Sequence, residues 1–223
     1  MKKIGIILSG CGFQDGSDPR ESVFILLQLE KRSCQVQFAS VKAIQREVID
    51  HHTQEIIPQS RDILVESARL SGINIQEIKD LSGAELDALI IPGGQGVIKN
   101  LSSATENEKL LKTHPDLRKL LREMHRRKKP IGGCGVASLI IAESLGDICE
   151  TSLTLTLGND PQLIQQLEKM EAVHVIAKGD EAIMDEQNRI VTTPGAQLKQ
   201  RTMDFYGGIE NLIEGILELT SQP

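Results

Sequence analysis

The sequence predicts an α/β fold in which helices cover both faces of a mostly parallel sheet. Short, β-rich apolar runs alternate along the chain with segments of helical periodicity. Glycine-rich turns follow several of these runs, at residues 10–12, 93–94 and 132–135. No internal repeat, low-complexity stretch or linker interrupts the 223 residues. We therefore expect a single domain over residues 1–223.

The first predicted strand, Lys2–Ser9, runs directly into the glycine-rich loop of residues 10–17. Asp18 then occupies a capping position, with Pro19 at the first helical position and Glu21 at the third, so a helix is predicted over 19–32. The same rules of periodicity and turn residues apply to the segments that follow. They predict strands at Gln35–Ala39, Ile73–Ile78 and Asp87–Ile91, and helices at Ser60–Leu70 and Pro115–Arg127.

The most informative stretch is Pro130–Ala142, which combines a short strand, a cysteine bracketed by glycines and an apolar helix. Beyond it, the pattern predicts strands on either side of a turn at Asp185–Asn188, and a closing helix with one apolar side. These later elements are strands at Leu153–Leu157, Val173–Ala177 and Ile190–Thr193, and helices at Pro161–Met170 and Thr202–Leu219.

Ligands of such folds bind outside the carboxyl ends of the parallel strands. Right-handed crossovers would open the three most glycine-rich of these loops on one edge of the sheet. They are the loops at Cys11, at Gly93-Gly94 and at Cys134. We therefore expect the chemistry of the protein to lie at this edge.

Composition excludes several functional classes. The chain carries 25 basic and 31 acidic residues, a formal charge of −6, which argues against a broadly basic nucleic-acid binder. The basic run Arg126–Lys129 is interpreted as a helix end. No apolar run approaches the ~20 residues of a membrane span, so we predict a cytoplasmic protein without membrane contact. Four cysteines without Cys-x-x-Cys spacing predict free thiols, with neither a disulfide framework nor a metal site.

Cys134 is the strongest candidate for a nucleophile. A cysteine at a sharp strand-to-helix turn would have an exposed sulfur above the first amides of the helix, which lower the thiol pKa. Gly132, Gly133 and Gly135 fit such a turn, because it crowds its neighbours as in the Gly-x-Ser-x-Gly elbow. A buried cysteine at a glycine-rich strand end explains the same residues equally well.

Gly93 and Gly94 end another predicted strand. Paired glycines there allow a backbone N–H to point at a developing oxyanion, with the N–H of Gly135 as its partner. In isolation a simple turn would be the preferred interpretation, and Cys134 farther along the chain favours the oxyanion site.

Several motifs resemble those of one known family. They are Ile4–Gly12, Asp15-Gly16-Ser17, Val48–His51, Ala88–Gly94, Lys99–Ser102 and Ile190–Pro194. They look like the ElbB family, described as isoprenoid-biosynthesis glyoxalases, in the PfpI-like branch of the class I glutamine amidotransferase-like superfamily. The resemblance covers residues 2–219. It implies a flavodoxin-like three-layer sandwich, a nucleophilic Cys134 with Glu21 facing it, and a homodimer.

The role of Glu21 has two interpretations. Its position makes it the glutamate of a capping box at the start of the second element. The resemblance instead implies a carboxyl group beside the thiol, which must share a proton with it or have a raised pKa, and this suits acid and base work.

The sequence departs from the family pattern in two places. Gly135-Val136-Ala137 follows the cysteine, where relatives have His or Ile-Ala-Pro. After Leu157-Gly158 the chain has Asn159, where members with a third catalytic residue carry His. We therefore predict no Cys-His-Glu triad, and expect Asn159, Cys11 and Gly12 to line the site.

The resemblance leads to two hypotheses. In the first, the protein is a cofactor-independent glyoxalase that converts the small aldehydes methylglyoxal or glyoxal to a hydroxy acid through a hemithioacetal of Cys134. In the second, it is a redox-responsive regulatory protein in which Cys134 is oxidised and Cys11 can resolve it as a disulfide. Glutaminase activity is disfavoured, because the histidine is missing.

Overall fold

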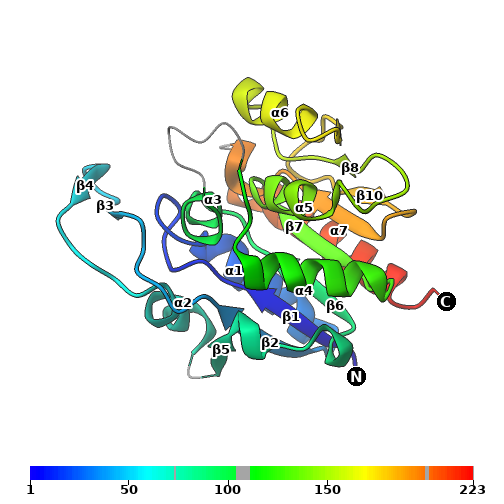
Figure 1. Cartoon of the computed structure of the whole chain (residues 1–223), viewed down its shortest axis with the longest axis horizontal. Coiled ribbons are helices and arrows are strands. Elements are labelled where there is room, and N and C mark those ends of the chain that lie inside the picture. Colours follow the sequence, from blue (N-terminus) through cyan, green and yellow to red (C-terminus); the bar gives the residue numbers. More distant parts are fainter. Residues whose placement is uncertain (73, 104–110, 199–200, 223) are drawn as a thin grey trace.

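The computed structural model describes residues 1–72, 74–103, 111–198 and 201–222. Among these residues, a seven-stranded sheet forms the central layer, in the order β10-β11-β7-β6-β1-β2-β5 (Figure 1). Its neighbouring strands are parallel except for the antiparallel β10–β11 pair. The strands are β1 Lys3–Ile7, β2 Gln35–Ser40, β5 Ile75–Glu77, β6 Ala88–Ile91, β7 Ile131–Cys134, β10 Ile183–Asp185 and β11 Ile190–Thr193.

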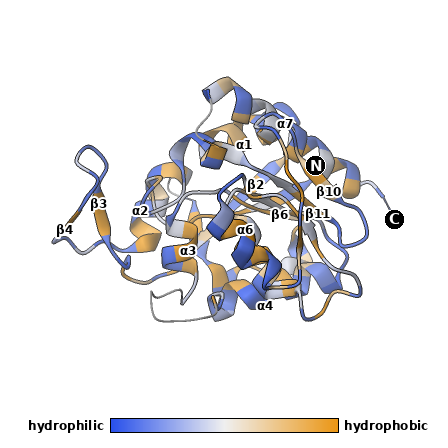
Figure 2. Ribbon diagram, turned by 90° about the horizontal axis from the view of Figure 1, so that it is seen from above, coloured by the Kyte–Doolittle hydropathy of each residue, from blue (hydrophilic) through white to orange (hydrophobic). Residues whose placement is uncertain are grey.

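Helices pack on both faces of this sheet. Helices α1 (Pro19–Lys31) and α7 (Thr202–Leu219) bury one apolar cluster against it, and α3 (Gly96–Leu101), α4 (Pro115–Arg126) and α5 (Ala137–Leu145) bury a second. Hydrophobic residues concentrate between the layers (Figure 2). A sheet covered on both faces needs strands that are apolar throughout, which is why the β6 run is fully buried. The predicted flavodoxin-like α/β sandwich is confirmed.

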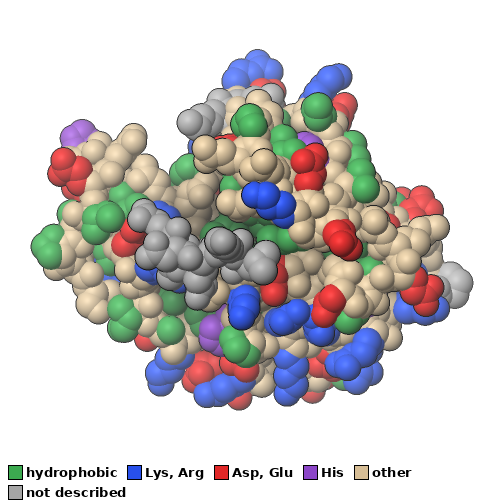
Figure 3. All heavy atoms as spheres, turned by 45° about the horizontal axis from the view of Figure 1, so that its top comes forward, with side chains coloured by type: hydrophobic (Ala, Val, Ile, Leu, Met, Phe, Trp, Pro, Cys, Tyr) green, Lys and Arg blue, Asp and Glu red, His purple; other side chains and the backbone are tan. Residues whose placement is uncertain are grey.

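Helix α4 shows why the basic run does not form a uniform basic surface. Its apolar side is buried, and its last turn leads into the cations of residues 126–129. Lys129 donates to the carbonyl groups of Gly83 and Ala84, and Arg122 pairs with Asp147. Acidic and basic side chains are interspersed on the face that Figure 3 presents. The interpretation of this run as a helix end is therefore confirmed.

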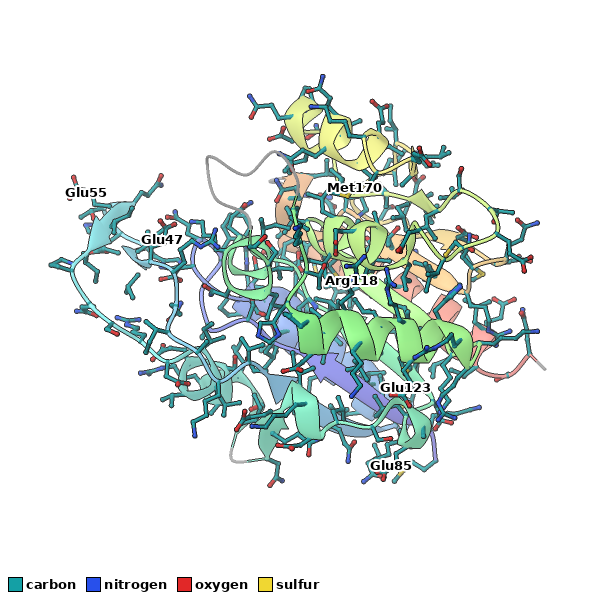
Figure 4. The ribbon with its side chains drawn as sticks, in the orientation of Figure 1. Glu47, Glu55, Glu85, Arg118, Glu123 and Met170 are labelled. Carbon is teal, nitrogen blue, oxygen red and sulfur yellow. The ribbon has the colours of Figure 1, made fainter. Side chains whose placement is uncertain are left out.

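A hairpin and a short helix are among the elements that were not predicted. The strands β3 (Val48–Asp50) and β4 (Glu55–Ile57) form an antiparallel hairpin that projects from the body, with Glu47 and Glu55 at its two ends (Figure 4). Helix α3 is the second. Each strand of the hairpin and the single helix are too short to produce a clear periodicity. The hairpin is held to the glycine-rich loop by the N–H of Ile49, which donates to the carboxylate of Asp15 at 2.8 Å.

The region between α5 and α7 differs from the prediction in its pairing. Val173–Ala177 was expected to pair across the Asp185–Asn188 turn, but β9 spans only Val173–His174 and pairs in parallel with β8, Thr154–Leu155. The partner of β11 across that turn is β10. The N–H groups of Val173 and Val175 donate to the carbonyl groups of Leu153 and Leu155, which holds this segment against β8. The carboxylate of Asp185 accepts from the N–H of Thr154 and ties β8 to β10.

The remaining helices agree closely with prediction. Helix α2 spans Ile63–Ser71, and α6 spans Pro161–Glu168. Strand β5 confirms the core of the expected Ile73–Ile78 strand, although Ile73 itself lies outside the described residues. None of the described helices is both long and apolar enough to span a membrane.

Candidate active site

Four loops meet at the carboxyl edge of the sheet, as the parallel topology requires. The loop after β1 is bonded to the loop after β6, because Gln95 N–H donates to the carbonyl of Phe13 at 2.6 Å. Asp18 N–H donates to the carbonyl of Gly93 at 2.8 Å, which joins the start of α1 to the same loop. The turn after β7 is tied to β11. The predicted convergence of the glycine-rich loops is confirmed.

Glu21 lies in the first turn of α1 and is almost completely buried. Its Oε2 accepts from the N–H of Gly93 at 2.6 Å, and its Oε1 accepts from the N–H of Ala196 at 2.6 Å. Asp18 caps the helix alone, through its own side chain. The carboxyl group of Glu21 therefore faces the sheet edge and does not act as a capping-box glutamate.

This environment raises the pKa of Glu21 to about 7. Burial is the main cause, because it penalises the charged carboxylate, and the nearby charge of Asp18 adds to it. The N–H groups of Ala196 and Gly93 and the charge of Arg20 act in the opposite direction and compensate only in part. Near neutral pH the carboxyl group is therefore present in both protonation states, which suits proton transfer.

Cys134 is the last residue of β7, and its side chain is fully buried within the apolar cluster under α1 and α7. Its side chain lies beside the carboxyl group of Glu21, since a Cβ on Gly195 would overlap Glu21 Oε1 and lie 3.3 Å from the Cβ of Cys134. Burial raises the pKa of the thiol well above its ordinary value, and the charges of Glu21 and Asp18 raise it further. The expectation of an exposed sulfur with a lowered pKa is wrong. The residue belongs to the strand, so its sulfur points into the core.

The residue that makes the strand-to-helix turn is Gly135, one position later. Its φ of +52° lies in the left-handed region, which an L side chain adopts only with strain. Its N–H donates to the carbonyl of Thr193 at 2.8 Å, so this amide is not available to an oxyanion, contrary to expectation. The N–H of Gly93 is likewise given to Glu21. Within the described part of the chain, the N–H of Gly94 has no hydrogen-bond partner and is the remaining candidate donor.

The structure gives the surroundings of the three residues expected to line the site. Cys11 is partly exposed, and its charged neighbours include Glu66 and Arg69 of α2. Burial raises the pKa of this second thiol, and Glu66 raises it further. Gly12 lies against the side chain of His51, and Asn159 is exposed to solvent.

The sequence reasoning missed the segment Gly195–Leu198, a short 3₁₀ turn directly after β11. It supplies the Ala196 N–H that holds Glu21, and it can approach so closely because a Cβ on Gly195 would overlap Glu21 Oε1. The side chain of Gln197 makes a second contact with the neighbouring loops. Nε2 of Gln95 donates to Oε1 of Gln197 at 3.3 Å. The position of this segment in the sequence could have revealed it. Pro194 and Gly195 follow a predicted strand, at the same edge of the sheet as the other loops.

Other chemistry is not visible around this pair. In the described ranges, no histidine forms a hydrogen bond or ion pair with Glu21 or Cys134. Nor does any group of three or more His, Cys, Asp or Glu side chains in those ranges have the arrangement of a metal site. The site is thus a buried carboxyl–thiol pair surrounded by backbone amides.

Comparison with known proteins places this site in context. No family model matches the chain. It is 31% identical to the human glutamine amidotransferase-like class 1 domain-containing protein 3, mitochondrial, over 99% of this chain and 84% of that protein. A crystal structure of an isoprenoid biosynthesis protein with an amidotransferase-like domain from Ehrlichia chaffeensis superposes with a TM-score of 0.90 and 30% identity, covering 97% and 99% of the two chains. A ThiJ/PfpI domain protein from Brachyspira murdochii shares the fold at 15% identity and a TM-score of 0.58, covering 99% and 98% of the two chains.

Proposed function

The chain belongs to the glutamine amidotransferase-like class 1 family, and from this premise we propose that it is a cofactor-independent glyoxalase of the ElbB kind. Its substrates would be small α-oxoaldehydes such as methylglyoxal or glyoxal, and its product a hydroxy acid. One observation supports the proposal above all: a buried carboxyl group with a pKa of about 7 lies beside a cysteine thiol. Neither group could do this chemistry alone.

The proposed reaction begins when the carboxylate of Glu21 takes the proton of the Cys134 thiol. The sulfur then adds to the aldehyde carbon, and the alkoxide takes the proton back from Glu21, so a hemithioacetal forms. Glu21 next moves the proton of this carbon to the neighbouring carbonyl carbon, while the hydroxyl proton passes to the neighbouring oxygen, so the adduct becomes a thioester of a 2-hydroxy acid. Water hydrolyses the thioester, which restores the thiol and releases lactate from methylglyoxal. Aldehyde and water balance the product, and no external oxidant is needed.

The sealed geometry predicts a modest rate. A thiol with a pKa well above its ordinary value is protonated at neutral pH, so each turnover requires proton transfer to Glu21 and local opening around the sulfur. The Gly94 N–H is the donor assigned to the developing oxyanion, since the amides of Gly93 and Gly135 are already bonded within the protein.

The test is lactate formation from methylglyoxal by the purified protein and its Cys134→Ala variant. We expect the variant to lose at least about 100-fold of the rate, which is the usual scale for a missing nucleophile or acid–base group. Cys34→Ala serves as the matched control, because this partly exposed thiol lies outside the site, and its activity should be unchanged. Equal activity of Cys134→Ala and the wild type would defeat the proposal.

A second candidate function is favoured by the burial of the sulfur, which predicts little turnover. We propose, as the alternative, a redox-responsive protein in which peroxide oxidises the Cys134 thiol to a sulfenic or sulfinic acid once local opening exposes it, each peroxide transferring one oxygen atom to the sulfur and leaving as water. Intact mass after dilute peroxide distinguishes the two, because two added oxygen atoms without lactate formation favour the regulatory role. A Cys11–Cys134 disulfide would do the same, although the charged neighbours of these two thiols are different residues.

Three further features remain proposals. We propose that residues 1–223 act as one domain, that the protein is a homodimer, and that it works in the cytoplasm. The exposed apolar side chains of Ile44, Ile56 and Val65, near the projecting hairpin and on α2, support an additional contact surface. The human relative carries the word mitochondrial in its name, so the cellular compartment of this protein is tested by locating the protein itself in cells.

A further inference from the structure

The segment Gly195–Leu198 lies directly over the buried pair. The N–H of Ala196 donates to Glu21 Oε1, and a Cβ on Gly195 would lie 3.3 Å from the Cβ of Cys134. Electrophiles that approach the thiol from this side must therefore displace the segment. Its position decides both whether Glu21 keeps its second amide donor and whether the sulfur is covered.

Gln197 is the side chain that attaches this segment to the neighbouring loops. Its stem packs against two glycines, since a Cβ on Gly135 would lie 3.4 Å from the Cβ of Gln197, and a Cβ on Gly158 would lie 3.1 Å from its Cγ. Its amide oxygen accepts from Nε2 of Gln95 at 3.3 Å. Gln95 is itself fixed, because it begins α3 and its N–H donates to the carbonyl of Phe13.

Both glutamines are partly exposed, whereas the carboxyl–thiol pair beneath them is buried. A hydrogen bond between two partly exposed amides competes with water and contributes about 1 kcal/mol, so it can open at little cost. A buried bond to a half-ionised carboxyl group is stronger. The bridge between the glutamines is thus the weaker of the two side-chain hydrogen bonds that hold the segment.

We propose that Gln197 is a positioning residue whose bridge to Gln95 holds the segment Gly195–Leu198 closed over Glu21 and Cys134, and so controls when the thiol meets an electrophile. The proposal rests on the proposed function only for the identity of that electrophile, a small aldehyde. The closed segment, its amide donor and the bridge are features of the fold.

Loss of the bridge also changes the surroundings of Glu21. When the segment loosens, the carboxylate loses the Ala196 N–H, a donor that lowers its pKa, and it loses part of the burial, which is the main cause of its raised pKa. The other groups that face Glu21 are Asp18 and Arg20 at the start of α1 and the Cys134 thiol on β7. They remain in place, so a shift of the Glu21 midpoint in either direction reports on the segment.

The experiment compares the wild type with Gln197→Ala, Gln95→Ala and the double variant. Alkylation of Cys134 by iodoacetamide is followed by peptide mass, and the Glu21 carboxyl carbon is titrated by NMR. We expect each single variant to alkylate at least about 5-fold faster, the scale of one lost hydrogen bond, and to shift the Glu21 midpoint. Because both glutamines act through one bond, the double variant should add little to either single variant.

Gln197→Met separates the bond from the packing, because it keeps the stem over the two glycines and removes the acceptor. It should behave like Gln197→Ala, whereas wild-type behaviour of Gln197→Met would overturn the bridge. Gln162→Ala, at an exposed position on α6, is the control and should change nothing. Unchanged alkylation and an unchanged Glu21 midpoint in folded Gln95→Ala would also overturn the proposal. None of these measurements uses aldehyde turnover, so they stand apart from the test of the glyoxalase.

Discussion

Two cysteines, Cys134 and Cys149, lie at opposite edges of the sheet and differ in how deeply they are buried and in which side chain lies beside the thiol. Cys134 ends β7, is fully buried and lies beside the carboxyl group of Glu21. Cys149 follows α5 at the other edge, is partly exposed and lies 3.7 Å from Nε2 of His125 in the last turn of α4. A histidine partner usually activates a thiol, whereas a carboxylate partner usually does the reverse.

In this molecule both thiols are protonated at neutral pH. The pKa of Cys149 is raised to about 11 by burial and by the charges of Asp185 and Asp147. His125 gives no cationic help, because burial lowers its own pKa. The comparison teaches that neither a glycine-bracketed turn nor a neighbouring imidazole determines the reactivity of a thiol. Desolvation and the sign of the nearest charges determine it.

The largest predicted effect is on access to the two sulfurs. We expect iodoacetamide to modify Cys149 at least about 1000-fold faster than Cys134 in the native protein, because exposure of a fully buried strand residue needs an opening of several kcal/mol. Peptide mass over a time course at constant pH measures both sites in one sample. Denatured protein, in which the rates should become equal, is the control. Faster modification of Cys134 would reverse the comparison.

The next effect concerns the carboxyl group beneath Cys134. The folded-state pKa of Glu21 is raised from 4.5 to about 7, so the folded protein holds a proton that the unfolded chain releases. The stability contribution of Glu21 is therefore fully present below pH 4.5 and is lost as the pH rises through about 7, by roughly 3 kcal/mol. Chemical denaturation across this pH range should show this decline in the wild type.

Glu21→Gln should remove that decline, although its absolute stability falls, because an amide cannot accept from both backbone N–H groups through two oxygens. Glu168→Gln, an exposed glutamate at the end of α6, is the matched control and should keep the wild-type slope. If Glu21→Gln retains the full pH dependence, the titrating group lies elsewhere.

The smallest effect tests the turn that keeps Cys134 inside the strand. Gly135→Ala should cost about 1–2 kcal/mol of unfolding free energy, because its φ is +52° and a Cβ would lie 3.2 Å from the carbonyl oxygen of Pro194. A measured cost below about 0.5 kcal/mol would show that the turn accepts a side chain without strain.

Prediction from the sequence succeeded where the signal was local. The cap at Asp18 and the proline after it predicted α1, and alternating apolar runs predicted β1, β6 and β11 within one or two residues. The family resemblance also placed Glu21 beside Cys134, and the structure adds the Gly93 N–H, which donates to Glu21. The sequence failed for the pairing of β9, because the partner of β9 is β8 and not a strand across the Asp185–Asn188 turn.

The sequence by itself determined the α/β class and the edge at which the loops meet, because strand and helix periodicity and crossover handedness are properties of successive residues. Only the tertiary structure decided that the thiol of Cys134 is protonated, that Gly135 makes the turn, and that Ala196 holds Glu21 from 175 residues away. A pKa depends on the solvent excluded and the charges brought near by remote segments. Those segments become neighbours only when the chain folds.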